Sequence, residues 1–210
     1  MPAQPVPMTP TSARRRLLKF GMAAALAATL AACGKSAPEK VSFHGSDITG
    51  SGLGSDLAMV DQTGKLRTLA DYRGKVVIAF FGFTHCPDVC PTAMAHLAQT
   101  LSLLGDQAKQ VQVIMISVDP ERDTPEIMGH YVTAFDPSFV GLTGTPDQLK
   151  ETARSFKAYY AKVKDDQGGY SMDHSASFYL FDPKGDIRVL ARPDMPAKDL
   201  AEDIKALLPQ

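Results

Sequence analysis

The chain has little net charge, few cysteines and no internal repeat. Its 22 Lys and Arg side chains nearly balance its 23 Asp and Glu side chains, which excludes the basic excess expected of a nucleic-acid-binding protein. Its Ala-rich apolar run, residues 20–32, is shorter than the roughly 20 residues of an ordinary transmembrane helix. What remains is a globular chain with an ordinary apolar fraction.

The first 32 residues have the composition of an export signal. They contain four basic side chains and no acidic ones, followed by the Ala-rich run, and this order is typical of a signal peptide. The segment ends in Leu30-Ala31-Ala32-Cys33, which resembles a bacterial lipobox and implies that Cys33 is lipidated and becomes the first mature residue. The arginines at 14–16 also resemble a twin-arginine signal, so two export routes stay open.

We therefore expect three regions: an export signal of the lipoprotein type at 1–32, a flexible tether at 33–54 and one folded domain at 55–210. The tether is rich in Gly, Ser, Pro and Lys. Four of the 22 basic side chains and none of the 23 acidic ones lie in the signal, so the mature chain has a net charge of −5. The expected location is the bacterial cell envelope, lipid-anchored to a membrane and facing the periplasm.

Two continuous apolar runs, residues 76–81 and 111–118, predict strands buried on both faces. Between them, Met94, Leu97 and Leu101 recur at helical spacing. Together these segments predict a strand-helix-strand unit with parallel strands.

The other elements follow from apolar periodicity and turn residues. Their order is thioredoxin-like, and the predicted fold is α/β, with a central mixed sheet flanked by helices and an N-terminal β-hairpin. The predicted elements are a hairpin at 57–69, helices at 125–135 and 146–160, a strand at 139–142, strands at 175–181 and 187–191 around a turn at 182–185, and a last helix with Leu200, Ile204, Leu207 and Leu208 on one face.

Apart from Cys33, Cys86 and Cys90 are the only cysteines of the chain, and they follow the predicted strand at 76–81. Pro91 lacks the N–H of a regular helix, so we expect the helix to begin near Pro91 and both cysteines to lie in the turn before it. Thiols in such a turn can form a disulfide or share a metal. Because a helix N-terminus stabilises thiolate, at least one of them should be acidic and reactive. A plain structural disulfide is the alternative, but so small a loop restricts the unfolded chain little.

Two thiolates are soft ligands, which favour copper(I) or zinc over hard cations, and a third donor is needed. His174 precedes the predicted strand at 175–181, after a Gly-rich loop that can fold over the site. On composition alone it is either a ligand or a structural histidine. The other histidines have expected places elsewhere: His44 solvated in the tether, His96 and His130 on helices at surface or half-buried positions, and His85 beside the thiols, where it either tunes thiolate charge or ends the strand.

Four ordered blocks resemble the Sco (SenC) family of copper-binding, thioredoxin-like proteins. They are DYRGKVVIAFFGFTHCPDVCPT (71–92), ISVDPERDTPE (116–126), VGLTGT (140–145) and DHSASFYLFDPKG (173–185), and the resemblance extends over residues 53–208. It implies that Cys86, Cys90 and His174 are the metal ligands and that Asp119 is the family's aspartate near the site. Asp119 ends the second strand at the same sheet edge as the cysteines, where it would hydrogen-bond to a ligand or ligate weakly; the alternative is a turn role.

The resemblance implies a copper metallochaperone. Its cargo would be copper(I) in three-coordination, or copper(II) with an added oxygen donor. The implied partners are a copper donor chaperone, a membrane reached through the lipid anchor, and an apo copper protein such as the cytochrome c oxidase subunit that holds the dinuclear copper centre.

An enzymatic alternative uses the same thiols. As a thiol-disulfide oxidoreductase, the chain would use Cys86 and Cys90 to keep target cysteines or copper chaperones reduced. Such a reductase has no use for His174, which favours metal binding. A peroxiredoxin-like peroxidase is disfavoured, because Phe83 stands where those sites place a threonine.

Neighbouring side chains have simpler expected roles. We expect Arg122 and Asp123 to form an exposed pair that shapes the loop after Asp119. Met172 could lend a soft thioether ligand, but methionine more often fills the core, and we expect that role here. Tyr159 and Tyr160 are expected to finish the apolar stripe of the helix at 146–160.

Overall fold

The structure is a computed structural model, and it describes residues 42–164 and 168–209. The predicted signal peptide, the predicted lipidation site Cys33 and residues 34–41 of the predicted tether lie outside the described residues. The compact unit that contains the predicted domain begins at Ser42.

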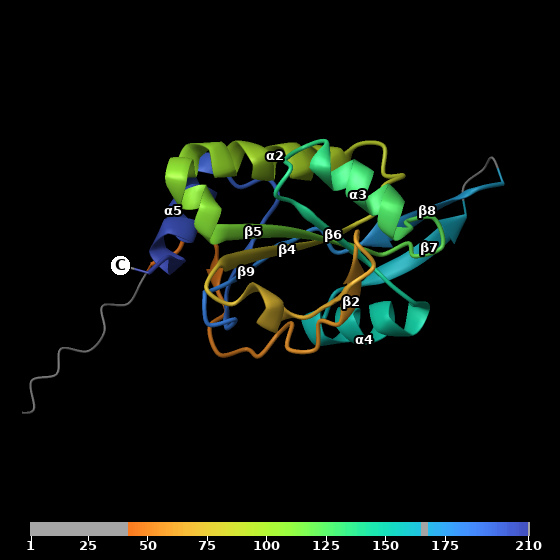
Figure 1. Ribbon diagram of the computed structural model, residues 1–210, viewed down its shortest axis with the longest axis horizontal. Coiled ribbons are helices and arrows are strands. Elements are labelled where there is room, and N and C mark those ends of the chain that lie inside the picture. Colours follow the sequence, from red (N-terminus) through yellow and green to blue (C-terminus); the bar gives the residue numbers. More distant parts are fainter. Residues whose placement is uncertain (1–41, 165–167, 210) are drawn as a thin grey trace, which may run out of the picture. The chain divides into compact units, whose positions relative to one another are not determined.

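A mixed sheet forms the centre of this unit (Figure 1), with the strand order β1-β10-β9-β4-β5-β6-β2-β3. Strand β4 pairs parallel with β5, and β5 pairs parallel with β6, whereas the other pairs are antiparallel. The strands are β1 (Ser46–Asp47), β2 (Met59–Asp61), β3 (Leu66–Arg67), β4 (Val76–Gly82), β5 (Val111–Ser117), β6 (Val140–Thr143), β9 (Phe178–Phe181) and β10 (Ile187–Ala191).

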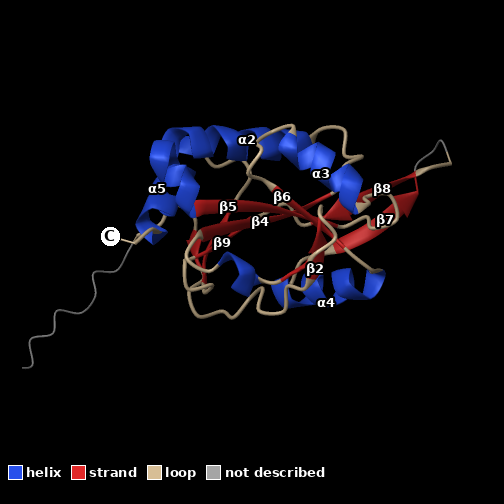
Figure 2. Cartoon of the chain, viewed as in Figure 1, coloured by secondary structure: helices blue, strands red, loops and turns tan. Residues whose placement is uncertain are grey.

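Helices cover both faces of the sheet (Figure 2). Helices α2 (Val89–Leu104), α3 (Pro125–Thr133) and α5 (Ala197–Leu207) lie on one face, and α4 (Pro146–Phe156) lies on the other. Every residue of β4 and β5 is buried, as expected of central strands in a layered α/β fold. Two short 3₁₀ segments, Leu69–Tyr72 and Gly105–Gln110, complete the connections. The predicted thioredoxin-like arrangement is confirmed, as are the β2–β3 hairpin and the hairpin of β9 and β10.

Threonine caps set the starts of α3 and α4. The Thr124 side chain accepts a hydrogen bond from the N–H of Ile127, and Thr145 accepts one from the N–H of Gln148. A proline follows each cap at the first helical position, where its missing N–H costs nothing. Both helices therefore begin where the sequence predicts.

Helix α2 begins earlier than predicted. It starts at Val89, which places Cys90 in its first turn, so the expectation that both cysteines precede the helix is wrong for Cys90. The first N–H groups of a helix have no partner within it, and Pro91 at the third helical position therefore breaks no bond. The first bond of the regular ladder joins the N–H of Thr92 to the carbonyl of Asp88 (3.1 Å).

Helix α4 ends four residues before the predicted end. Lys157 adopts a left-handed conformation (φ 51°) that stops the helix after Phe156. The predicted helical role of Tyr159 and Tyr160 is wrong, because Tyr160 opens strand β7 (Tyr160–Lys164). This strand pairs antiparallel with β8 (Tyr170–His174) in a separate two-stranded sheet, in which Tyr160 faces His174.

Part of the predicted tether belongs to the fold. Strand β1 lies inside it and pairs with β10, with Ser46 opposite Leu190. The preceding residues are also attached, because the N–H groups of His44 and Gly45 donate to the carboxylate of Asp203 on α5 (2.7 and 2.9 Å). A composition rich in small and polar residues therefore concealed an edge strand.

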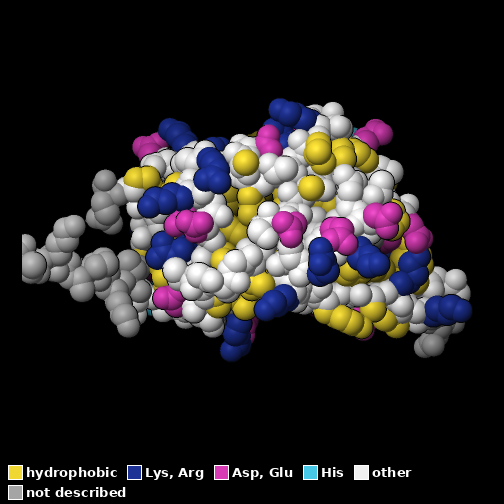
Figure 3. Space-filling model, turned by 90° about the horizontal axis from the view of Figure 1, so that it is seen from below, with side chains coloured by type: hydrophobic (Ala, Val, Ile, Leu, Met, Phe, Trp, Pro, Cys, Tyr) yellow, Lys and Arg dark blue, Asp and Glu magenta, His cyan; other side chains and the backbone are white. Residues whose placement is uncertain are grey.

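The surface carries both signs of charge. Figure 3 shows one face of the molecule, on which Lys and Arg side chains lie among Asp and Glu side chains. Within the described ranges, no helix combines the length and the apolar character needed to span a membrane.

Candidate metal centre

Cys86 and Cys90 lie where the central strand β4 ends and α2 begins. Both are free thiols, Cys86 half-buried and Cys90 fully buried. The N–H of Cys86 donates to the carbonyl of Phe83 (3.3 Å), which closes the turn. The N–H of Cys90 donates to Sγ of Cys86 (3.4 Å), so the first turn of the helix presents a donor to that sulfur.

Burial acts against ionisation of Cys90. It raises the pKa of the Cys90 thiol far above the ordinary value, because a buried thiolate loses its hydration. The expectation of an acidic thiol therefore does not hold for Cys90. A bound cation would reverse this balance, because metal binding displaces the thiol proton.

His174 lies beside Cys90. Its Nε2 atom lies 3.6 Å from Sγ of Cys90, although the two residues are 84 positions apart. Its Nδ1 atom lies 2.9 Å from the carbonyl oxygen of Ser175. Because a carbonyl can only accept, Nδ1 carries the proton, and the lone pair of Nε2 is directed at the thiol. This is the tautomer that an Nε2 metal ligand requires.

Two aromatic rings hold the imidazole in place. Phe83 meets the His174 ring edge to face, with centroids 5.8 Å apart, and Phe80 does so at 6.3 Å. Phe80 belongs to β4 and Phe83 to the turn before Cys86, so the chain that positions the thiols also orients the imidazole.

The spacing of one donor pair, Cys90 Sγ and His174 Nε2, fits a shared metal ion. With bonds of about 2.3 Å to sulfur and about 2.0 Å to nitrogen, the lengths typical of zinc, an angle of about 120° separates the two donors by about 3.7 Å. The observed separation of Cys90 Sγ and His174 Nε2 is 3.6 Å. Two soft sulfurs and one imidazole are a donor set suited to copper(I).

Asp119 acts on strand β8. It is 2% exposed, and its carboxylate accepts hydrogen bonds from the guanidinium of Arg122 and from the hydroxyl of Tyr170 (3.0 Å). Tyr170 begins β8, the strand that ends at His174. These side-chain bonds connect Asp119 to the strand that carries His174, at a position four residues before the histidine.

Arg122 makes further contacts with the same strand. Its guanidinium carbon lies 3.8 Å from the centroid of the Tyr170 ring, and its Nη1 donates to the carbonyl of Tyr170 (3.1 Å). Nζ of Lys162, on β7, lies 4.1 Å from the centroid of the Tyr170 ring and 2.6 Å from the carboxylate of Glu121. We call Asp119, Arg122 and Tyr170 the hairpin clamp, because they attach the β7–β8 hairpin to the loop after β5.

The prediction of an exposed pair of Arg122 and Asp123 is wrong. Arg122 pairs with Asp119 instead, and Asp123 has an exposed fraction of 0%. The Asp123 carboxylate accepts from the hydroxyls of Thr84 and Ser117, both at 2.6 Å. It thereby joins the cysteine turn to the end of β5. The sequence did not predict this burial, because a threonine and a serine elsewhere in the chain are not a specific signal for a buried carboxylate.

Tyr131 is a residue that the sequence did not single out. Its hydroxyl is buried and has no hydrogen-bond partner among the described residues. Burial raises the pKa of Tyr131, and the charges of Cys90 and Cys86 add to the effect. Met128 and Val132 are buried core residues of the same helix, α3. In the sequence, Tyr131 therefore looks like one more apolar position of a helix.

The remaining candidates lie outside the thiol site. His85 is exposed beside Cys86, with Nδ1 3.2 Å from the Thr84 hydroxyl. His96 is half-buried and stacks on Phe178, and burial lowers its pKa, whereas His130 is exposed, both as predicted. Met172 is 7% exposed in the core, which confirms its predicted packing role.

Comparison with known proteins gives one family. The SCO1/SenC family model matches residues 46–209. An SCO2-like protein of Rickettsia felis is 34% identical over 155 residues, which cover 73% of this chain and 76% of that protein. A mitochondrial SCO2 homolog of Bos taurus is 43% identical over 133 residues, 62% of this chain, and the match spans about half of the bovine protein's length (50%).

Solved structures agree in fold. ScoI of Bradyrhizobium japonicum with copper bound has a TM-score of 0.69 and 40% identity, over 74% of this chain and 99% of that chain. A SCO1/SenC family lipoprotein from Bacillus anthracis has a TM-score of 0.63 and 28% identity, over 79% and 99%. BsSco, a member of the Sco family of cytochrome c oxidase assembly proteins with a disulfide switch, has a TM-score of 0.60 and 28% identity, over 78% and 96%.

Proposed function

Because the chain belongs to the SCO1/SenC family, we propose that it is a copper chaperone that binds copper through Cys86, Cys90 and His174. The observation that carries the proposal is the approach of His174 Nε2 to Cys90 Sγ at 3.6 Å, with the Nδ1 proton held by Ser175. A copper-bound relative with 40% identity supports the choice of metal.

Copper is the cargo of this site. Binding replaces the thiol protons, so each Cys–copper bond that forms releases one proton to solvent. The raised pKa of Cys90 means that the proton is held firmly until a cation arrives. The three donors leave a copper(I) ion three-coordinate, with room for a thiolate of a recipient protein to attack the metal.

Anaerobic titration of the reduced chain with copper(I) tests the proposal. We expect one tightly bound copper per chain, and a thiolate-to-metal charge-transfer band when copper(II) is used. A stoichiometry near zero, or copper binding that survives replacement of both cysteines by serine, would refute it.

The proposed recipient is an extracytoplasmic copper protein, namely the cytochrome c oxidase subunit that carries the dinuclear copper centre. The relation to BsSco, a cytochrome c oxidase assembly protein by its description, supports this recipient. A copper donor chaperone is the proposed source of the metal. Transfer of copper from the loaded chain to the purified apo subunit, followed by absorption spectroscopy, is the direct test.

A thiol-disulfide oxidoreductase is the second candidate, and the unequal exposure of the thiols favours it. Cys86 is half-buried and can reach a partner's disulfide, whereas Cys90 is fully buried and could resolve the mixed disulfide that results. In that reaction the target disulfide is reduced while Cys86 and Cys90 become oxidised. Reduction of a test disulfide that persists in a His174→Ala variant would identify this activity.

The proposed location is the bacterial cell envelope, with a lipid on Cys33 as the membrane anchor. The lipobox resemblance of Leu30-Ala31-Ala32-Cys33 and the likeness to a family lipoprotein support it. Because stable anchoring takes more than one acyl chain, a fully modified Cys33 is required. A Cys33→Ser variant should appear in the soluble fraction, whereas the native chain should fractionate with membranes.

A further inference from the structure

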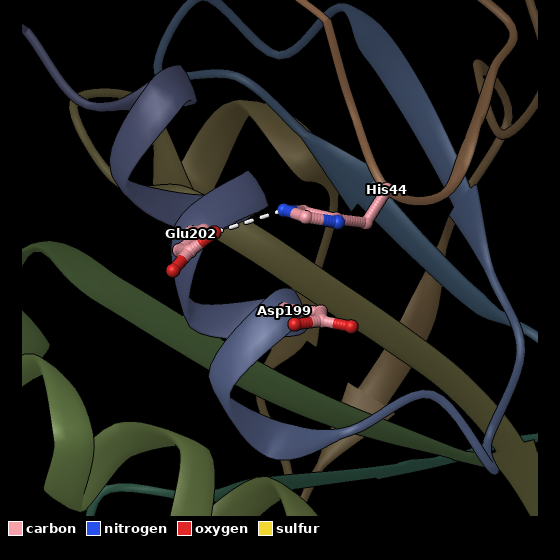
Figure 4. A group of neighbouring side chains, drawn as sticks. All are labelled: His44, Asp199 and Glu202. Atoms are coloured by element: carbon pink, nitrogen blue, oxygen red, sulfur yellow. Dashed lines mark hydrogen bonds and ion pairs between the residues drawn. The ribbon is translucent and has the colours of Figure 1, made fainter.

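A second group of metal-ligating side chains lies away from the thiols, between the segment before β1 and helix α5. His44, Asp199 and Glu202 each offer one ligand atom, and these atoms all lie within 4.8 Å of one another. Figure 4 shows the imidazole of His44 reaching over the helix, with Nε2 2.9 Å from Oε2 of Glu202 and the carboxylate of Asp199 beside it.

The backbone that presents His44 is fixed to the same helix. The N–H groups of His44 and Gly45 donate to the two carboxylate oxygens of Asp203, which is 1% exposed. Gly45 also packs tightly, since a Cβ atom there would lie 2.5 Å from Cγ1 of Val189. The backbone that carries the imidazole is therefore held in place by the buried Asp203 carboxylate, which favours a preorganised site.

The helix supplies the other two donors from one face. Asp199 and Glu202 are three positions apart in α5, the spacing that places side chains next to one another on a helix surface. Three further charged side chains lie close: Lys198 is 3.8 Å from Glu202, and Arg192 and Asp194, which pair with each other, line the same surface cavity as His44. The three candidate ligands thus carry two carboxylate charges, and the ammonium group of Lys198 offsets one of them.

Open space borders the group. A surface cavity of about 350 Å³ is lined by His44 and Asp199 together with Met195, Pro196, Arg192 and Asp194. The side chains of His44 and Glu202 are 45% and 47% exposed, so water reaches the ligand atoms. A metal ion held by three protein donors could complete its coordination with water molecules on this side.

We propose that His44, Asp199 and Glu202 form a second metal site, which takes a divalent late transition metal ion, copper(II) or zinc. One imidazole nitrogen and two carboxylate oxygens are borderline and hard donors, which suit these divalent ions and not copper(I). Among first-row divalent ions at such a site, copper(II) binds most tightly. The site differs from the thiol centre in its donors, and no thiol takes part in it.

Titration of the full chain with copper(II) or zinc tests the site, in a background that lacks the thiol centre (Cys86→Ser, Cys90→Ser and His174→Ala) and without an affinity tag that contains histidine. We expect one equivalent to bind, with nitrogen hyperfine coupling from a single imidazole in the copper(II) spectrum. Adding His44→Ala should remove that coupling and lower the affinity about tenfold or more, because the loss of even an outer partner of a metal ligand has an effect of about this size.

His130→Ala is the matched control, since His130 is also exposed and lies on α3. It should change neither the affinity nor the spectrum. Glu202→Gln should weaken binding while leaving the backbone bonds of His44 to Asp203 intact. The proposal is overturned if the background chain binds no divalent ion, or if His44→Ala binds as the His130→Ala control does; an unchanged melting temperature of each variant excludes unfolding as the cause of any loss.

Discussion

His174 Nε2 and Cys90 Sγ lie 3.6 Å apart, across a gap of 84 positions in the chain. The thiol comes from the first turn of α2, and the imidazole comes from the end of the β7–β8 hairpin. The site therefore depends on the contacts that hold this hairpin against the sheet, and not only on the Cys86 to Cys90 turn.

Replacing His174 with alanine should lower copper affinity about 100-fold or more, since the loss of an outer partner of a ligand alone has an effect of about 10–100-fold. Competition with a chelator of known copper affinity measures this change. The thiols remain, so reduction of a disulfide substrate should persist. His96→Ala is a suitable control because His96 stacks on Phe178 outside the donor group. Equal copper affinities of the native and His174→Ala chains would contradict the ligand assignment.

Tyr170→Phe tests the hairpin clamp. The change removes the hydroxyl that donates to Asp119 (3.0 Å) and keeps the ring on which Arg122 stacks. We expect copper affinity to fall about tenfold, because His174 would be held less firmly at the end of the same strand. Copper competition and the charge-transfer spectrum measure the effect.

Tyr159→Phe is the control for the clamp, since Tyr159 is 62% exposed and neighbours the same hairpin. Its copper affinity should equal that of the native chain. If Tyr170→Phe also leaves affinity and spectrum unchanged, Asp119 and Tyr170 have no part in positioning His174.

The central part of the fold was predictable because its signals are local. Seven consecutive buried residues mark each of β4 and β5, and Thr-Pro pairs mark the starts of α3 and α4. The cysteine turn follows directly from the end of β4. These features require no knowledge of contacts between distant segments.

Other parts of the fold and site depend on contacts between distant segments, which apolar periodicity does not reveal. Tyr160 continues the apolar spacing of α4, and only the left-handed Lys157 redirects the chain into β7. The sequence placed Asp119 at the right sheet edge, but its partner Tyr170 is 51 positions away. The place of His174 came from the family resemblance, since composition alone left it as a ligand or a structural histidine.

Asp61 should make stability depend on acid pH. Burial by itself would raise its pKa, but hydrogen bonds from Thr63, Arg67 and Lys65 outweigh that effect and lower the pKa from 3.8 to about 2. A lowered folded-state pKa stabilises the fold above the unfolded value, and this stabilisation is lost as pH falls from about 4 to about 2. The lost free energy of unfolding is about 2 kcal/mol.

Chemical denaturation of the native and Asp61→Asn chains at pH 6 and pH 2.5 measures this contribution. The native chain should lose about 2 kcal/mol more than the variant over this range, since only the native chain has the titrating carboxylate. Asp106→Asn, at an exposed site (96%), should follow the native chain. Parallel pH profiles for the native and Asp61→Asn chains would show that the β2–β3 turn does not depend on this carboxylate.

Gly82→Ala should disturb the packing around the sulfur of Cys90. A Cβ atom at this position would lie 3.1 Å from Sγ of Cys90, 2.9 Å from Phe80 and 3.0 Å from Met115. Overpacking of this kind costs about 1–3 kcal/mol, and here it would also displace the sulfur. We expect a lower melting temperature and weaker copper binding. Gly129→Ala, in α3, meets only the side chain of Gln62 and should change copper binding little.

Copper binding and disulfide formation should exclude one another. When the disulfide forms, each of the two sulfurs loses its proton and one electron, and an added oxidant such as oxidised glutathione takes them up. The oxidised chain therefore keeps only His174 of the three donors. We expect the reduced chain to bind one copper(I) and the oxidised chain to bind none at the same concentration, and loaded copper should slow oxidation by the glutathione couple.

Because Cys90 is fully buried, attack should begin at Cys86, so a Cys90→Ser chain should still form a mixed disulfide with glutathione. Tight copper(I) binding by the disulfide form would contradict the thiolate ligands, whereas oxidation at equal rates with and without copper would show that the bound metal leaves Cys86 free.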